Sequence, residues 1–292
     1  LTTYRIDDQT IPVTQSDGGD CDICNPTPAL IKTAEAKEGG AHKPAPALIR
    51  AMGLDRQVQP NNWLFPIAPS LPLTPATATR LRTDLGKSHR HHSIVLRSVN
   101  GDNSDALTAA GFQVLPVGKV YVSATGEAPP TAPRIDYEPA EAHTFSATDF
   151  TRAAVLCAMS DSERGIGNPP RYTPGFLAQA HQIGLINMHG LRAPDDTLDA
   201  IIGFYEHDGM LLAPVIGLDS SKPAAGQLAT AIKALLRTRA RALQKPYAIT
   251  PAQATTLQDH SGTATPEHIA IYTGHLGLKR RAATKLGTRF LS

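Results

Sequence analysis

The chain has 292 residues, of which 41% are hydrophobic and 18% are charged. This length suits one large domain or two of ordinary size, and the composition excludes a chain that is disordered throughout. The 28 Lys and Arg residues nearly balance the 26 Asp and Glu residues, and a formal net charge of +2 argues against a nucleic-acid-binding protein.

The first half of the chain predicts helices and strands in alternation. In chain order these are a helix over Pro28–Glu38, a strand over Asn62–Ile67, a helix from Pro75 through Leu85, a strand over Ser93–Arg97, a helix over Asp105–Ala110 and strands within Gln113–Val122. Residues 124–134 contain three prolines and show no periodicity, which predicts a linker.

The second half restarts at a helix cap, Thr148. The predicted elements are a helix through Met159, a helix over Thr173–Ile183, a strand over Leu185–His189, a hairpin of Thr197–Tyr205 and Met210–Leu218, a helix over Ala224–Leu243, and strands over Tyr247–Ile249 and His268–Tyr272. The hairpin turn carries Asp208-Gly209, a pair that favours tight turns.

The two halves show a similar order of elements, although no repeat of fixed period is visible. This order predicts an α/β fold (α+β mixed sheets) built from two copies of one unit. We expect an N-terminal lobe over residues 1–135 and a C-terminal lobe over residues 136–292.

Several features predict where the chain acts and what it lacks. No apolar run approaches the roughly 20 residues that a membrane span needs, so we predict no membrane partner. Three cysteines do not build a disulfide framework, which is typical of a reducing compartment and predicts a cytoplasmic protein. Cys21 and Cys24 lack two further ligands at zinc-site spacing, so the predicted metal content is none.

The absence of known sequence motifs argues against two classes of enzyme. One basic segment has two possible interpretations. The chain has no G-x-S-x-G elbow, P-loop or G-x-G-x-x-G, which disfavours a serine hydrolase and nucleotide-dependent chemistry. A basic segment near the C-terminus consists of Lys279, Arg280, Arg281, Lys285 and Arg289. It is interpreted either as a solvated terminal helix or as a contact to phosphates of a cofactor or tRNA.

The strand Met210–Leu218 leads through a short loop into the long helix that starts at Ala224. A helix N-terminus placed after a strand offers backbone amides and the positive end of a dipole to an anion. We therefore expect this junction to line the pocket for an anionic or carbonyl group.

The chain resembles a bacterial group of two-lobed GNAT-like proteins related to the Fem-type aminoacyl ligases. In the first half the resemblance rests on Ile11–Thr14, Cys24–Pro26, Val58–Leu64, Ile94–Asn100, Ala110–Phe112 and Lys119–Tyr121. In the second half it rests on Asn168–Pro169, Gly190–Arg192, Leu198–Gly203, Gly217–Ser220 with Pro223, and Ile271–Leu276.

The resemblance implies an N-acyltransferase that moves an acyl or aminoacyl group to the amine of a small molecule, in specialised metabolism. It implies no permanently bound cofactor and an acyl thioester (carrier-protein or CoA-linked) as co-substrate. An acyl-carrier protein as a partner follows from two departures from the family pattern. Asp219 or Glu206 would be the base, and Tyr205 or Tyr272 the acid for the leaving thiolate. Donor contacts are expected at Val215, Ile216, Gly217, Ser220 and Gly226. Substrate contacts are expected at Asn62, Trp63, Arg97, Asn100, Lys119, Tyr121 and Asn168.

The chain departs from the family pattern at two places. The family signature [RQ]-x-x-G-x-[GA] is absent from the donor junction, where Pro223 stands in place of Arg or Gln. The stretch Thr250–Gly262 carries no Lys or Arg, which disfavours a polyanionic donor such as tRNA. These departures leave a second interpretation, a catalytically degenerate GNAT scaffold that binds a metabolite or a partner.

Overall fold

The computed structural model describes residues 2–18, 24, 51–69, 71–124, 136–163, 172–207, 209–278 and 281–285. The chain divides into two compact units. Unit 1 comprises residues 1–118 and 266–292, and unit 2 comprises residues 119–265. No helix among the described residues is long and apolar enough to cross a bilayer. The predicted helix over Pro28–Glu38 and nearly all of the predicted linker lie outside the described ranges.

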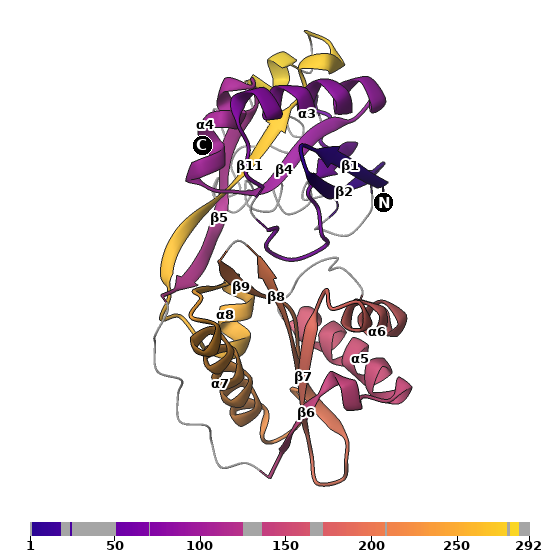
Figure 1. The fold of residues 1–292 in the computed structure, drawn as a ribbon, viewed down its shortest axis with the longest axis vertical. Coiled ribbons are helices and arrows are strands. Elements are labelled where there is room, and N and C mark those ends of the chain that lie inside the picture. The colour runs from indigo at the N-terminus through magenta and orange to yellow at the C-terminus, as the bar shows by residue number, and fades with distance from the viewer. Residues whose placement is uncertain are drawn as a thin grey trace, which may run out of the picture. The chain divides into compact units, whose positions relative to one another are not determined.

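Unit 1 is a mixed sheet with helices packed on it (Figure 1). Its elements are β1 (Thr2–Ile6), β2 (Gln9–Ser16), β3 (Gln57–Pro60), α3 (Pro75–Ser88), β4 (Ser93–Val99), α4 (Gly101–Ala109), the first part of β5 (Gln113–Ser123), the second part of β11 (Thr263–Tyr272) and the 3-10 helix η2 (Gly274–Leu276). Strand β3 runs parallel to β4, whereas the pairs β1–β2, β2–β3 and β4–β11 are antiparallel.

The helix α3 shows how the sequence specifies this unit. Thr74 caps the helix by accepting a hydrogen bond of 3.1 Å from the Thr77 amide, and Pro75 occupies the first turn, where its missing N–H costs nothing. Leu81 and Leu85 lie one turn apart and are buried, so the helix presents one apolar stripe to the sheet.

Unit 2 is a sheet covered by helices on both faces (Figure 1). Its elements are β6 (Glu138–Glu141), the 3-10 helix η1 (Ala142–Thr144), α5 (Ala147–Glu163), α6 (Pro174–Gln182), β7 (Asn187–Arg192), β8 (Leu198–His207), β9 (Met210–Leu218), α7 (Ala225–Leu243), β10 (Tyr247–Ile249) and α8 (Pro251–Leu257), with the ends of β5 and β11. Strand β10 runs parallel to β9, and the pairs β6–β7, β7–β8, β8–β9 and β5–β10 are antiparallel.

The helices of unit 2 pack against opposite faces of the same strands. One stripe of α7, with Leu228, Ile232 and Leu236, packs on the face of β8 and β9 that carries Ile202 and Ile216. On the other face, α5 lies so close to β9 that a Cβ added at Gly217 would lie 2.8 Å from the Leu156 carbonyl carbon. The close approach requires glycine at this position, because no side chain fits between strand and helix.

The two units repeat one order of elements. In unit 1, three strands (β1 to β3) precede α3, β4, α4 and β5, and in unit 2 three strands (β7 to β9) precede α7, β10, α8 and β11. In each unit the third strand, the long helix and the next strand form a parallel β-α-β crossover. The repeated order agrees with the predicted tandem α/β architecture.

The last strand of each repeat pairs with the fourth strand of the other repeat. Strand β5 of the first repeat pairs with β10, and β11 of the second repeat pairs with β4. For this reason residues 266–292 belong to unit 1, whereas the division predicted from the sequence places them in the C-terminal lobe.

Some predicted elements differ from those observed. The predicted strand over Asn62–Ile67 is wrong: the strand is β3, and the residues after it form an irregular loop. Strands β1 and β2 and helix α8 were not predicted, because β1 and β2 are rich in Thr and Gln and α8 is short. The helices α3, α5, α6 and α7 and the β8–β9 hairpin confirm the predictions for those segments.

Candidate functional site

The parallel strands β9 and β10 diverge in the middle of unit 2. They pair only at Leu211 with Tyr247 and at Leu212 with Ala248, after which β10 ends and β9 continues along β8 to Leu218. The register between β8 and β9 shifts at the same place, since Gly203 lies opposite Val215 and Tyr205 lies opposite Leu212. Strand β9 therefore carries one extra residue, a β-bulge within Ala213–Pro214.

Beyond the bulge, alternate backbone groups of β9 face away from β8. The Asp219 amide donates to the Asp199 carbonyl of the β8 side, whereas the Leu218 amide donates to the Ser160 hydroxyl at 2.9 Å. Because successive peptide groups of a strand alternate in direction, the backbone of Ile216 faces the same way as that of Leu218, toward the side that β10 has left. Of the predicted donor contacts, Val215, Ile216 and Gly217 lie on this segment and are buried.

Two side chains already contact the bulge from that side. The Gln253 amide donates a hydrogen bond of 2.7 Å to the Ala213 carbonyl, and the Tyr172 hydroxyl donates at 3.4 Å to the Pro214 carbonyl. Gln253 also completes a capping box with Thr250 at the start of α8. Its side chain is buried, and it thus joins α8 to β9 across the point of divergence.

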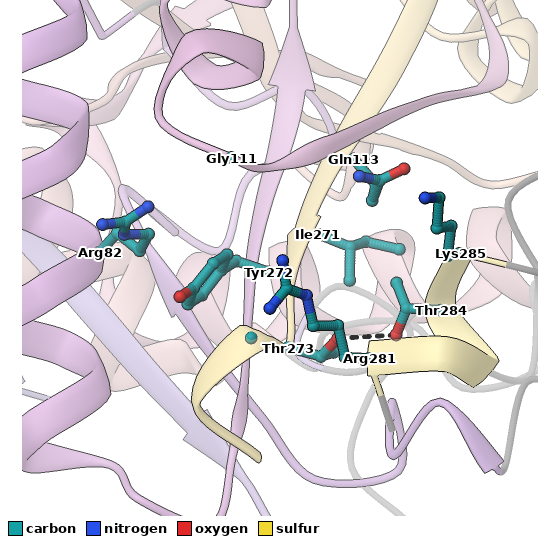
Figure 2. Close-up of a pocket in the computed structure, with 10 residues that line it drawn as sticks. Arg82, Gly111, Gln113, Ile271, Tyr272, Thr273, Arg281, Thr284 and Lys285 are labelled. Carbon is teal, nitrogen blue, oxygen red and sulfur yellow. Dashed lines mark hydrogen bonds between the residues drawn. The ribbon is translucent and has the colours of Figure 1, made fainter. Parts of the chain in front are cut away.

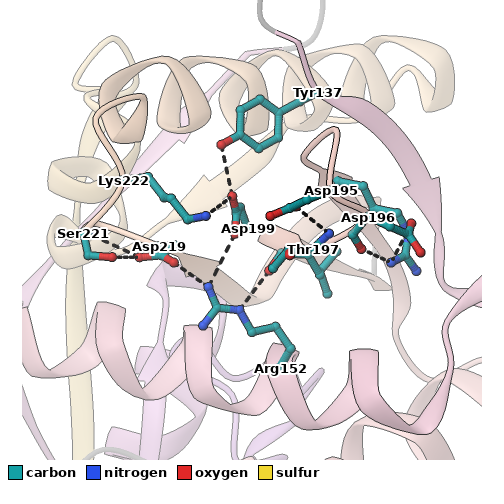
Figure 3. A network of polar contacts seen from close by, with 11 residues as sticks. Tyr137, Arg152, Asp195, Asp196, Thr197, Asp199, Asp219, Ser221 and Lys222 are labelled. Carbon is teal, nitrogen blue, oxygen red and sulfur yellow. Dashed lines mark hydrogen bonds and ion pairs between the residues drawn. The ribbon is translucent and has the colours of Figure 1, made fainter.

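An ion-pair network fixes the loop between β9 and α7 (Figure 3). The fully buried Asp199 accepts hydrogen bonds from the Tyr137 hydroxyl at 3.0 Å and Arg152 at 3.4 Å, and it forms an ion pair of 3.1 Å with Lys222. Arg152 also pairs with Asp219. The two carboxylates and two cations balance each other, so the network anchors the loop at both ends.

Asp219 is engaged from several directions. It accepts hydrogen bonds from the Ser221 amide at 3.0 Å and the Ser221 hydroxyl at 2.5 Å, as well as from Arg152. Burial acts to raise the pKa of Asp219, but the hydrogen bonds from Ser221 and Arg152 outweigh it and lower that pKa. A carboxylate with a lowered pKa is a weak base, so the geometry favours a positioning role for Asp219 over a role as general base.

The first turn of α7 follows this loop. No side chain caps the helix at Ala224, and its first turn contains no acidic residue. Ser220 and Gly226, two further predicted donor contacts, are exposed. The positive end of the dipole of this 19-residue helix is thus not compensated by a side chain of the helix itself.

The other predicted catalytic residues lie apart from Asp219. Glu206 lies at the opposite end of the β8–β9 ladder, opposite Leu211, and pairs with Arg239 at 2.9 Å and Lys245 at 3.2 Å. Tyr205 lies opposite Leu212, beside the bulge, and stacks on the ring of His207. Tyr272 belongs to unit 1. The structure therefore brings Tyr205, among these residues, next to the bulge.

Three predicted substrate contacts of unit 1 meet at one loop, to which Asn62 and Trp63 belong and which Arg97 contacts from β4. Asn62 is buried and donates to Thr14 and to Gln59, both at 2.9 Å. The Trp63 indole donates to the side chain of the preceding Asn61, and Arg97 donates to the carbonyls of Phe65 and Pro66. These contacts hold the loop against β4, beyond the point where β3 ends.

The remaining predicted contacts are dispersed. Asn100 caps α4 by accepting a hydrogen bond from the Asn103 amide. Lys119 and Tyr121 lie in the part of β5 that belongs to unit 2, where the ammonium lies 5.2 Å from the ring centroid. Asn168 lies outside the described residues. Within the described part of the chain, no cluster of three His, Cys, Asp or Glu side chains could hold a metal ion.

Sequence reasoning missed the residues that organise this site. Arg152, Asp199 and Lys222 come from three elements, and the pairs that they form span up to 67 residues of sequence. Gln253 carried a local signal, since Thr250 and Gln253 match the capping-box spacing, but that signal indicates only a helix start.

Tyr137 provides a test of the network by its alkaline titration. Burial, the hydrogen bond to Asp199 and the charge of that carboxylate raise the pKa of Tyr137 to about 12, from about 10 in an unfolded chain. Its contribution is thus complete below pH 10 and is lost as pH rises toward 12. We expect Tyr137→Phe to cost roughly 1 kcal/mol of unfolding free energy at pH 8 and progressively less toward pH 11. Denaturant unfolding of the original protein and of Tyr137→Phe measures this difference in unfolding free energy. An equal difference at pH 8 and pH 11 would contradict the hydrogen bond between Tyr137 and Asp199.

Comparisons with known proteins complete the description of this site. No protein-family model matches the chain, and no curated protein matches it. Similar solved structures include a GCN5-related N-acetyltransferase from Kribbella flavida, with 16% identity, a TM-score of 0.43 and coverage of 76% of this chain and 83% of that chain.

Two further structures are similar. The L-PGS from Bacillus licheniformis has 8% identity and a TM-score of 0.47, and the alignment covers 74% of this chain and 78% of that chain. A tandem GNAT protein from the clavulanic acid biosynthesis pathway has 11% identity and a TM-score of 0.45, and the alignment covers 92% of this chain and 99% of that chain. At these identities and TM-scores the likeness concerns general architecture alone.

Proposed function

We propose that this chain is a cytoplasmic N-acyltransferase of GNAT type that moves an acyl or aminoacyl group from a thioester donor to the amine of a small molecule in specialised metabolism. The observation that carries the proposal is the bulge at Ala213–Pro214, located where β10 leaves β9. A bulge at the end of a parallel pairing re-aims backbone groups of the strand, and backbone donors aimed at a thioester carbonyl stabilise the oxyanion that forms on it.

The proposed reaction needs little more than positioning. The amine nitrogen attacks the thioester carbonyl carbon, and the C–S bond breaks when the tetrahedral intermediate collapses to the amide and a thiolate. The backbone of β9 at Val215–Gly217 would stabilise the oxyanion. Tyr205 would supply a proton to the thiolate and would recover one, through water, from the attacking nitrogen as the amide forms. Because Asp219 and Glu206 are each held by cations, the proton of the ammonium would leave to water.

The loop over Asp219–Pro223 and the first turn of α7 are the proposed position of the donor arm. This loop carries one Lys, and the ion pair of Lys222 with Asp199 already engages its charge. A full CoA pyrophosphate would need more compensation than one helix dipole provides. We therefore expect donors on a carrier protein, with their single phosphodiester, to be preferred over free CoA thioesters, and no permanently bound cofactor to be required.

Asp219→Ala is the variant that tests the loop. We expect it to lower kcat/KM for transfer by about 10- to 100-fold, because the loop loses its anchor to Arg152 and Ser221 and the donor is misplaced. Mass spectrometry of amines incubated with acyl-CoAs and acyl-carrier-protein thioesters measures the transfer. Asp196→Asn, at a side chain that is 88% exposed, is the matched control and should transfer at the original rate. Equal rates for Asp219→Ala and the control would refute the loop assignment.

A second candidate function is a catalytically degenerate scaffold that binds a metabolite or partner. The observation that favours it is the pair of side-chain contacts from Gln253 and Tyr172 to the bulge, which occupy carbonyls on the side that β10 has left. No mass increase in any amine with any donor, together with saturable amine binding by calorimetry, would select this function over transfer.

A further inference from the structure

A pocket of about 340 Å³ lies in unit 1, at the C-terminal end of β11. This basic pocket is lined by Arg82, Gly111, Gln113, Ile271, Tyr272, Thr273, Gly274, Arg281, Thr284 and Lys285 (Figure 2). Its volume is at the small end of the range for ligand pockets, roughly 300–1,000 Å³. The proposed transfer site belongs to unit 2 and uses none of these residues. Tyr272, which the sequence analysis named as a possible catalytic acid, lines the basic pocket instead.

The charged residues that line the basic pocket are all positive. The lining includes the cations Arg82, Arg281 and Lys285, and none of the described lining residues is acidic. The whole chain has a net charge of only +2, so three cations around one small pocket form a local excess. Like charges gathered in a concave, partly desolvated site repel one another, and a bound anion would relieve that repulsion.

Arg82 is held in place by neighbouring groups. The Arg82 guanidinium donates a hydrogen bond of 2.6 Å to the Ala110 carbonyl and lies 5.1 Å from the centroid of the Tyr272 ring. Gly111 has a φ of +88°, and a Cβ at this position would lie 3.3 Å from the same guanidinium. The backbone turn that borders the pocket therefore depends on glycine.

The C-terminal helical residues are fixed to β11 by a buried contact. The hydroxyls of Thr273 and Thr284 are 2.7 Å apart, and both residues are buried. Arg281 and Lys285 are four positions apart in the helical stretch 281–285, so they lie on one side of it. Figure 2 shows Arg82, Arg281 and Lys285 arranged around the end of β11.

We propose that the basic pocket binds the phosphate group of a small molecule. A phosphate dianion offers several oxygens to guanidinium, ammonium and amide donors at once, whereas a carboxylate carries one charge on two oxygens. The His275 ring stacks on the Tyr272 ring with 5.7 Å between their centroids, and Arg82 also lies over the Tyr272 ring. Tyr272 therefore does not serve as a stacking platform for a nucleotide base. The recognised chemistry is thus the phosphate itself, either free or as a monoester.

The test is phosphate binding by the full chain. Titration calorimetry with inorganic phosphate and with methyl phosphate, at constant ionic strength, should give saturable binding at one site. The double variant Arg281→Ala/Lys285→Ala should weaken it by at least about 10-fold, because two charge-assisted contacts are lost. Both side chains are exposed, so this variant should remain folded. Lys87→Ala, an exposed cation on α3 outside the lining, should bind as the original protein does.

Each result decides the proposal. Tighter binding of methyl phosphate assigns the pocket to phosphorylated organic ligands, and tighter binding of inorganic phosphate assigns it to free phosphate. Amide chemical-shift changes at Gly111, Gly274 and Thr284 on adding phosphate would place the ligand in the basic pocket. Equal affinity of the double variant and the original protein would overturn the proposal, as would a response to phosphate no larger than that to chloride at the same ionic strength.

Discussion

Asp199→Asn is expected to lower the unfolding free energy of unit 2 by about 3 kcal/mol. The carboxylate is completely buried, and Arg152, Lys222 and Tyr137 all point to it. Removing its charge leaves Arg152 with Asp219 and takes from Lys222 its buried partner. The effect belongs at the lower end of the range for broken buried ion pairs, since the side chains of Arg152 and Lys222 are 27% and 33% exposed.

Asp196→Asn is the matched control for that variant. Asp196 also pairs with an arginine, at 3.5 Å from Arg192, but its side chain is 88% exposed. An exposed pair contributes little, so the control should change the unfolding free energy by less than about 1 kcal/mol. Urea denaturation followed by circular dichroism compares the two variants. Equal small losses would show that the network around Asp199 does not stabilise the loop.

Gly217→Ala is expected to cost about 3 kcal/mol, although it adds a single methyl group. The added Cβ would lie 2.8 Å from the Leu156 carbonyl carbon and 2.8 Å from the Cys157 amide nitrogen, both in the backbone of α5. Backbone atoms of a helix cannot rotate aside as the end of a side chain can. The strand and the helix must therefore separate, and contacts along the whole α5–β9 interface are loosened.

Gly226→Ala supplies the comparison for Gly217→Ala. Gly226 lies in the first turn of α7, and a Cβ there would meet nothing within 4 Å. Alanine restricts the unfolded chain and suits a helix, so this variant should gain roughly 0.5–1 kcal/mol. Thermal unfolding of both proteins should shift Tm in opposite directions. A Gly217→Ala protein as stable as the original would mean that α5 and β9 are not in close contact.

The parts of the fold that could be predicted are those with local chemistry. Thr74-Pro75 and Thr173-Pro174 mark helix starts through caps and a fixed proline φ, and both helices begin at the predicted place. In contrast, β3 contains Gln57 and Gln59, which are buried because their amides bond to each other and to the backbone. Polarity alone indicates a loop there, and the predicted strand was therefore placed on the apolar stretch that follows β3.

In the candidate site, as in the fold, the local pattern could be predicted from the sequence and the long-range contacts could not. A strand followed by a helix is a local pattern, and this pattern alone predicts the β9–α7 junction. The bulge depends on register between two strands, and Gln253 reaches Ala213 across 40 residues of sequence. Asp219 was predicted as a base because a carboxylate in a loop has no visible partner in sequence. Its partner, Arg152, is 67 residues away.

The exchange of β5 and β11 has a consequence for the order of folding during synthesis. Strand β11 lies between β4 and β5 in unit 1, and it begins at Thr263, whereas β5 ends at Ser123. At the usual rate of translation, about 5–20 residues per second, the ribosome needs roughly 7 to 28 s to make the intervening residues. During that interval the edge of β4 has no partner and can pair with other chains. Unit 1 therefore folds late, although most of its sequence is synthesised first.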